Sequence, residues 1–193
     1  MLDEKDFAEM VEEYSRSDSA REGLIKLGRD IIKVSKQIIY NTHRNDLAKA
    51  DSYVKEIKRL VKKFNDIAEK NPELLYSGAY KSVVQEYVEA VAYFSFVKNK
   101  KIPSRKELGV QAECYLLGLC DLTGELVRNA ILSATKERYA EVKAINDVVE
   151  RIFNNLLQFD FRNSDLRKKF DSVKYDLKKL EDLVLQLKLK EKI

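Results

Sequence analysis

Apolar residues recur at helical spacing along almost the whole chain of 193 residues. They repeat at i, i+3, i+4 and i+7, which is the spacing of one face of an α-helix. Only two prolines and six glycines interrupt these stripes, whereas a β-rich chain of this length would need many more turn residues. The pattern therefore predicts an all-α protein, a single-domain bundle of about six to seven helices over residues 1–193.

Polar breaks separate the predicted helices. A short first helix is expected to end at the run SRSDS, which makes residues 1–18 an N-terminal extension of the domain. Ser19 and Glu22 then match a capping box that would start the next helix. The later helices are expected at about these positions: from 19 to His43, from Asp46 to just before Pro72, from 73–80 to Lys98, a short helical start after Ser104 with Glu107, 110–134, 139–159, and from 163–165 onward.

The last predicted helix carries the most regular stripe of the chain. Its apolar positions alternate in steps of four and three residues, which is the spacing of a coiled-coil seam. Such a seam packs either against other helices of the same bundle or against a second copy, and its regularity favours self-association. The positions are Leu166, Phe170, Val173, Leu177, Leu180, Val184 and Leu187.

Composition limits both the class of protein and the cellular compartment that we expect. The net charge is +4, which is too small a bias to indicate a nucleic-acid partner by itself. Cys114 and Cys120 lie on one predicted helix, about 9 Å apart along its axis and too far for a disulfide. We therefore expect the cysteines to be reduced. The N-terminus is acidic and unlike a signal peptide, and the chain lacks a run of about 18 apolar residues. These features predict a cytoplasmic protein with no membrane partner.

Two apolar segments carry carboxylates that their neighbours do not explain. The segment SVVQEYVEAVAYFSFV has only Glu86 and Glu89 as charges, and CYLLGLCDLTGEL has only Asp121 and Glu125. Each pair lies on one face of its helix, and burying an ionised carboxylate without a partner is costly. Three arrangements would neutralise these acids: a bound metal ion, a network of buried ion pairs, or polar contacts at an interface.

The side chains available narrow these alternatives without deciding between them. Carboxylates alone suit the hard ions Mg²⁺ and Mn²⁺, which support phosphoryl chemistry above all. Arg128, about one helical turn from Asp121 and Glu125, is a ready partner for an ion-pair network. The chain has one histidine, His43, which cannot provide the paired Glu-x-x-His motifs of di-iron bundles. The same shortage of histidines argues against a zinc site. We expect His43, at a helix end, to be a cap or a surface contact.

Basic residues gather in several clusters along the predicted helices. Most clusters of this kind are solvated helix faces, and they indicate nucleic-acid binding only if they share one surface with the carboxylates. The clusters are Lys55, Lys58, Arg59, Lys62 and Lys63; Lys98, Lys100 and Lys101; and Arg162, Arg167, Lys168 and Lys169.

Four segments resemble the translin/TRAX family. QEYVEAV (85–91) and YLLGLCDLTGELVR (115–128) are similar to the two carboxylate helices of TRAX, and KLGRDIIKVSK (26–36) is similar to the family's first long helix. The tail FRNSDLRKKFDSVKYDLKKLEDLVLQL (161–187) is more similar to translin. The likeness covers nearly the whole chain, with the motifs in the family's order.

This resemblance implies a translin-like subunit of mainly seven helices that assembles into a hollow homo-oligomer, commonly an octamer, and acts on single-stranded RNA. The TRAX site for Mg²⁺-dependent endoribonuclease activity carries over, motif to motif, onto Glu86, Glu89 and Asp121 and also onto Glu125, as metal-binding and catalytic residues. The implied function is an endoribonuclease that uses Mg²⁺ or Mn²⁺. Because translin lacks these acids, the alternative is a non-catalytic scaffold that binds single-stranded RNA or DNA.

The nucleic-acid contacts depart from the family pattern. Translin has an Arg/His-rich segment just before the first carboxylate helix, where this chain reads LLYSGAYK with one basic residue. We therefore expect basic residues outside this segment to contact RNA as well. The candidates are Lys81, Lys98, Lys100, Lys101 and Arg128.

Overall fold

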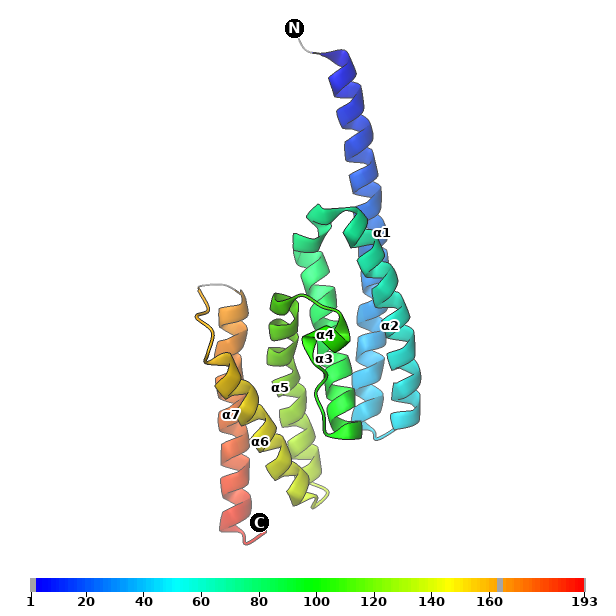
Figure 1. Cartoon of the computed structure of the whole chain (residues 1–193). Helices are drawn as coiled ribbons and strands as arrows, with labels where there is room; N and C mark the ends of the chain where they lie inside the picture. The colour runs from blue at the N-terminus through cyan, green and yellow to red at the C-terminus, as the bar shows by residue number, and fades with distance from the viewer. Residues whose placement is uncertain (1–2, 163–164, 193) are drawn as a thin grey trace.

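The computed structural model describes residues 3–162 and 165–192, and within these ranges the chain is helical with no strand. This confirms the predicted all-α class. Along the chain (Figure 1) the elements are α1 (Glu4–His43), α2 (Leu47–Lys70), the 3₁₀ helix η1 (Pro72–Tyr76), α3 (Gly78–Asn99), α4 (Arg105–Leu108), α5 (Ala112–Ala134), α6 (Tyr139–Leu156) and α7 (Asp165–Leu189).

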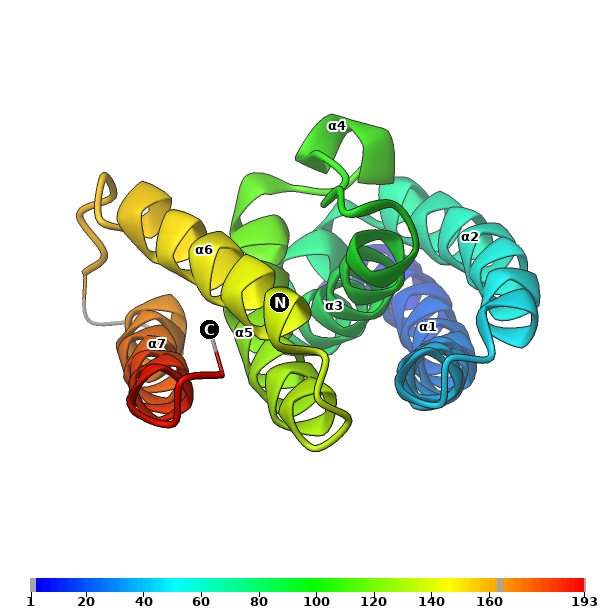
Figure 2. The same cartoon turned by 90° about the horizontal axis from the view of Figure 1, so that it is seen from below.

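The helices form two groups of three that meet at the contact between α3 and α5. Helix α1 packs on α2 and α3, and α5 packs on α6 and α7. Seen from below, α3 and α5 lie in the centre, with α1 and α2 on one side and α6 and α7 on the other (Figure 2). Each group has its own hydrophobic core, and α3 contributes to both, with Val88 in the first and Tyr93 in the second.

Side-chain caps explain where several helices begin. The Asp3 carboxylate accepts the backbone N–H of Lys5 at 3.0 Å at the start of α1, and Ser77 caps α3 by accepting the N–H of Tyr80 at 3.2 Å. The predicted capping box is present at α4, where Ser104 Oγ accepts the N–H of Glu107 and the Glu107 carboxylate accepts the N–H of Ser104. Such caps satisfy backbone donors that a helix start leaves without partners.

The prediction of a break at SRSDS is wrong, because α1 runs without interruption through this segment. Ser19 does not cap a new helix. Its hydroxyl donates to the carbonyl of Ser15 at 2.9 Å, one turn back, a bond that lets serine remain inside a helix. No proline interrupts the segment, so nothing forces the backbone out of helical geometry.

The regular stripe of α7 packs inside the chain, against α5 and α6. Val173 and Leu180 are fully buried, and α7 contacts both α5 and α6. Phe170 stacks on Phe153 of α6 with ring centroids 5.6 Å apart. The 4-3 spacing correctly indicated a packed seam, but its partners are α5 and α6 rather than a second subunit.

Among the described residues, no helix combines the length and the apolar character that crossing a membrane would require.

The crossing of α3 over α5 is close because α5 has glycine there. A Cβ built on Gly118 would lie 2.6 Å from Val88 Cβ and 2.9 Å from the carbonyl oxygen of Gln85, both closer than packed atoms can stand. A side chain at position 118 would therefore push the two central helices apart.

We expect Gly118→Ala to destabilise the protein by about 1–3 kcal/mol, since it overpacks a rigid contact. Gly23→Ala is the matched control: it also lies inside a helix, a Cβ there meets nothing within 4 Å, and alanine should stabilise by about 0.5–1 kcal/mol. Urea unfolding followed by circular dichroism measures both. Equal stabilities for the two variants would contradict the close contact.

Candidate functional site

The four acids singled out from the sequence come together where α3 crosses α5. Glu86 and Glu89 face α5, and each interacts electrostatically with Asp121 and Glu125. Gln85 of α3 donates a hydrogen bond directly to the Asp121 carboxylate. The predicted convergence of the two carboxylate pairs is therefore present.

Asp121 and Glu125, on α5, have partners in the protein. Asp121 Oδ1 accepts a hydrogen bond from the Lys169 ammonium of α7 at 2.5 Å. Glu125 Oε2 lies 2.5 Å from His43 Nε2 and 3.8 Å from the Arg128 guanidinium. Because the Arg128 side chain is 63 % exposed, its pairing with Glu125 contributes little. On α5, Asp121 therefore has an ion pair with Lys169, and Glu125 has a hydrogen bond with His43.

Glu86 and Glu89, on α3, have no such partners. Within the described part of the chain no hydrogen bond or ion pair joins either carboxylate to another group. Burial raises the pKa of Glu89 to about 8, and the negative charges of Asp121, Glu86 and Glu125 act in the same direction. Burial also raises the pKa of Glu86, while Lys36 of α1 and Lys169 oppose this shift. Among the described residues, the α3 acids therefore have positive charges nearby but none in direct contact.

His43 belongs to this site, so its predicted placement at the surface is wrong. Its side chain is 6 % exposed, because the end of α1 lies against α3 and α5. Asn129 donates to the Tyr93 hydroxyl at 2.8 Å, and that hydroxyl lies 2.8 Å from His43 Nδ1. With its oxygen accepting from Asn129, Tyr93 donates to Nδ1, which assigns the proton of the neutral ring to Nε2. His43 Nε2–H then donates to Glu125.

The donor set suits a hard divalent ion. Every candidate ligand at the crossing is a carboxylate oxygen, which Mg²⁺ and Mn²⁺ prefer. The described residues do not, however, contain three or more acids, cysteines or histidines already gathered tightly enough to hold a metal. The chemistry of the site therefore fits an ion, and the side chains would have to draw together around it.

Most of the residues predicted to contact nucleic acid lie away from the carboxylates. Lys81 pairs with Glu113 at 2.8 Å, Lys98 with Asp51 at 2.6 Å, and Lys101 with Glu107 at 3.1 Å. Lys98 lies in the last turn of α3, and Lys100 and Lys101 follow its C-terminal end, about 13 Å or more along the helix from Glu89. Of these five predicted nucleic-acid contacts, Arg128 borders the carboxylates.

Two basic residues at the carboxylates were missed as site residues. Lys36 projects from α1 and Lys169 from α7, and both act on Glu86. Lys36 lies in the KLGRDIIKVSK segment and Lys169 in a basic cluster, but neither position indicates which helix it faces. Only the packing of α1 and α7 beside α3 and α5 brings these amines to the acids.

The translin family model matches residues 19–191. The chain belongs to the translin family. An uncharacterised protein of Methanocaldococcus jannaschii is 31 % identical, with 94 % of this chain and 84 % of that protein aligned. The translin-associated protein X homolog of Schizosaccharomyces pombe is 23 % identical, with 97 % and 89 % aligned. Chicken (Gallus gallus) translin is 26 % identical over 58 % of this chain and 55 % of its own length.

Solved structures share this translin-family fold. The crystal structure of apo-NeC3PO superposes with a TM-score of 0.87 at 31 % identity, covering 96 % of this chain and 98 % of that one. AfC3PO in complex with duplex RNA gives a TM-score of 0.84 at 24 % identity, with 96 % and 97 % covered. The fold expected from the resemblance is confirmed.

The raised pKa of Glu89 makes the stability of the metal-free protein depend on pH. Its pKa lies near 4.5 when unfolded and about 8 when folded, so the folded state binds more protons between these values. The free energy of unfolding should therefore fall as pH rises from about 5 to 8, by at most about 1.4 kcal/mol per pH unit from this group. Urea unfolding in EDTA at pH 6, 7 and 8 measures the slope.

Glu89→Gln removes this titration, so its slope should be shallower and its relative stability greatest at pH 8. Glu150→Gln, on the exposed face of α6, should keep the wild-type slope. Parallel slopes for Glu89→Gln and the wild type would show that Glu89 is not protonated in the folded protein.

Proposed function

We propose that this translin-family protein is a metal-dependent endoribonuclease that cleaves single-stranded RNA as part of a homo-oligomer. The observation that supports this most strongly is the pair Glu86 and Glu89. These are two partly buried carboxylates that make no hydrogen bond or ion pair with any residue the structure describes, and they lie opposite two further acids. A purely structural role for such a pair would leave its desolvation uncompensated.

A divalent cation would compensate these charges and provide the chemistry. When bound, Mg²⁺ or Mn²⁺ neutralises charge on a phosphodiester and lowers the pKa of a water molecule. We assign Glu86, Glu89 and Asp121 to holding the ion. The His43 hydrogen bond fixes Glu125 through Oε2, which leaves its Oε1 to accept the proton of an attacking water.

Basic residues around the acids would bind the RNA backbone. Lys36, Lys169 and Arg128 come from three different helices and border the carboxylates. Ammonium and guanidinium groups bind phosphate oxygens through charge-assisted hydrogen bonds. Support for RNA as the ligand comes from the resemblance to TRAX and from AfC3PO, a protein of the same fold solved with duplex RNA.

A non-catalytic scaffold for single-stranded RNA or DNA is the second candidate. It is favoured by the two acids of α5, which are already paired with Lys169 and His43, and by the absence of a ready metal cluster among the described residues. In that case Lys36, Lys169 and Arg128 would still bind phosphates, but no bond would be broken.

Cleavage of a labelled single-stranded RNA separates these two functions. We expect products with Mg²⁺ or Mn²⁺ and none with EDTA. Glu89→Gln should reduce the rate by about 100-fold or more, since it removes a proposed metal ligand while keeping the size of the side chain.

Glu150→Gln is the matched control and should cut at the wild-type rate. Gel-shift binding of the same RNA in EDTA, together with the melting temperature, shows whether each variant still folds and binds. Cleavage by Glu89→Gln at the control rate, or no cleavage with either metal by a protein that binds RNA, would favour the scaffold instead.

A further inference from the structure

The first turns of α1 project beyond the rest of the molecule (Figure 1). All side chains from Asp3 to Arg16 are exposed, yet four of them form an apolar stripe at i, i+3, i+4 and i+7. Their exposed fractions are 49 % for Phe7, 44 % for Met10, 68 % for Val11 and 77 % for Tyr14. An apolar helix face this open to solvent marks a surface that binds a partner.

This projecting segment, which we call the acidic arm (residues 4–16), also carries a strong negative charge. Between Asp3 and Asp18 the sequence has seven acidic and two basic residues. The apolar stripe is therefore bordered by carboxylates. A surface that binds it should be apolar in the middle and positively charged at its edge.

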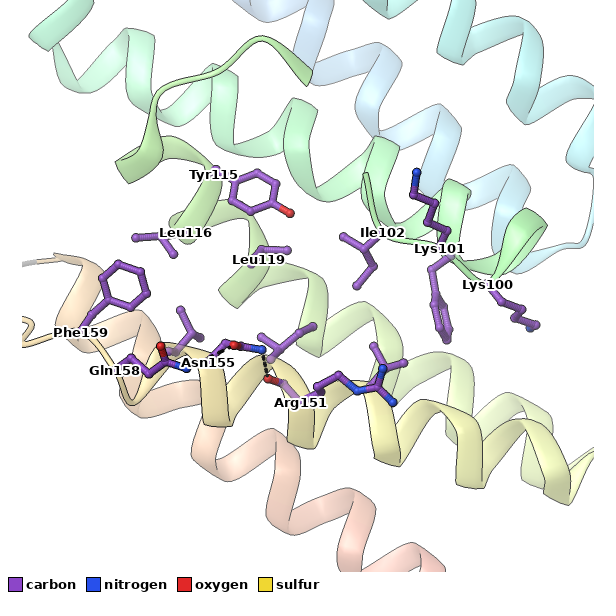
Figure 3. A pocket seen from close by; sticks show the side chains of 14 residues that line it. Lys100, Lys101, Ile102, Tyr115, Leu116, Leu119, Arg151, Asn155, Gln158 and Phe159 are labelled. Carbon is purple, nitrogen blue, oxygen red and sulfur yellow. Dashed lines mark hydrogen bonds between the residues drawn. The ribbon is translucent and has the colours of Figure 1, made fainter. Parts of the chain in front are cut away.

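A groove with these properties lies between α5, α6 and the loop after α3 (Figure 3). It has a volume of about 610 Å³ and no acidic residue in its lining. Its wall is formed by apolar and aromatic side chains, among them Ile102, Leu116, Leu119 and Phe159. Phe159 itself is 50 % exposed. We call this the basic-rimmed groove.

Three cations border the groove: Lys100, Lys101 and Arg151. Lys101 pairs with Glu107. Lys100 and Arg151 have no carboxylate partner in the part of the chain that the structure describes. Lys100 lies with its ammonium 5.4 Å from the centre of the Phe96 ring, at the edge of the apolar wall. The groove therefore offers two unneutralised positive charges beside apolar surface.

The arm cannot reach the groove of its own chain. The arm is the N-terminal end of α1, which is one helix of 40 residues, and residues 4–16 span about 20 Å along the helix axis. The C-terminal part of the arm borders Lys70, Asn71 and Glu73 of the same chain. The arm points away from the rest of the molecule in Figure 1, whereas side chains of α5, α6 and the loop after α3 line the groove. A partner for the arm must come from another molecule.

We propose that the acidic arm of one copy docks into the basic-rimmed groove of a second copy. The apolar stripe fills the groove as an amphipathic helix, and the bordering carboxylates neutralise Lys100 and Arg151. Arm and groove are different surfaces, so the contact is of the heterologous type and leads to a closed ring or a chain of subunits. This contact between arm and groove does not depend on the proposed endoribonuclease activity.

Self-association measured by size-exclusion chromatography with light scattering tests this contact. Val11→Ser with Tyr14→Ser alters the arm, and Lys100→Glu with Arg151→Glu alters the groove. Each double variant should weaken association about tenfold or more, as for residues at the centre of an interface. The matched controls are Tyr175→Ser with Leu185→Ser, which are exposed to similar extents on α7, and Lys143→Glu with Lys174→Glu on exposed faces of α6 and α7.

All four double variants should keep wild-type helicity, since the substituted side chains are exposed. Wild-type association of either the arm or the groove variant, or equal weakening in the controls, would overturn the proposal. So would a groove variant that associates normally but loses binding of single-stranded RNA, because the groove would then be a nucleic-acid site.

A cross-link locates the contact directly. Benzoylphenylalanine in place of Val11, activated in a mixture of isotope-labelled and unlabelled protein, should form products that join two copies. The attached peptides should come from residues 100–102, 115–119 or 151–159. Products confined to one copy, or attached outside these ranges, would overturn the proposal.

Discussion

The close crossing of α3 and α5 is the contact on which the rest of the structure depends. Gly118 leaves room for Val88 and for the backbone of Gln85, so the two central helices approach more closely than side chains would permit. Since α3 contributes to both hydrophobic cores, this crossing also joins the two groups of helices. The same crossing brings the carboxylates of α3 opposite those of α5.

The acids at this crossing have direct partners on one helix, but within the described residues they have none on the other. Asp121 and Glu125 have Lys169 and His43 as partners. In the described ranges, Glu86 and Glu89 are influenced by positive charges only at a greater distance. A protein selected for stability alone would gain little from such an arrangement. Buried carboxyl groups with a raised pKa at a fixed position are typical of a site that binds a cation or a substrate.

Helix α1 connects the proposed site with the proposed assembly contact. Its C-terminal half provides Lys36 and His43 beside the acids, and its N-terminal end forms the acidic arm. Because one uninterrupted helix carries both, docking of the arm would fix the orientation of α1 in the assembly. The stripe of α7 takes no part in such a contact, since α5 and α6 bury it within the chain.

Local patterns in the sequence determined most of the helices and the identity of the acids. Periodicity and capping residues depend on near neighbours, so they correctly indicated the helix at Ser104, the packed seam of α7 and the shared faces of Glu86 with Glu89 and of Asp121 with Glu125. Spacing along a helix states which side chains share a face, but it does not state what that face meets. Only the tertiary structure decided that Lys36, Lys169 and His43 lie at the acids, that α7 packs within its own chain, and that α1 continues through SRSDS, because these outcomes depend on contacts between distant segments.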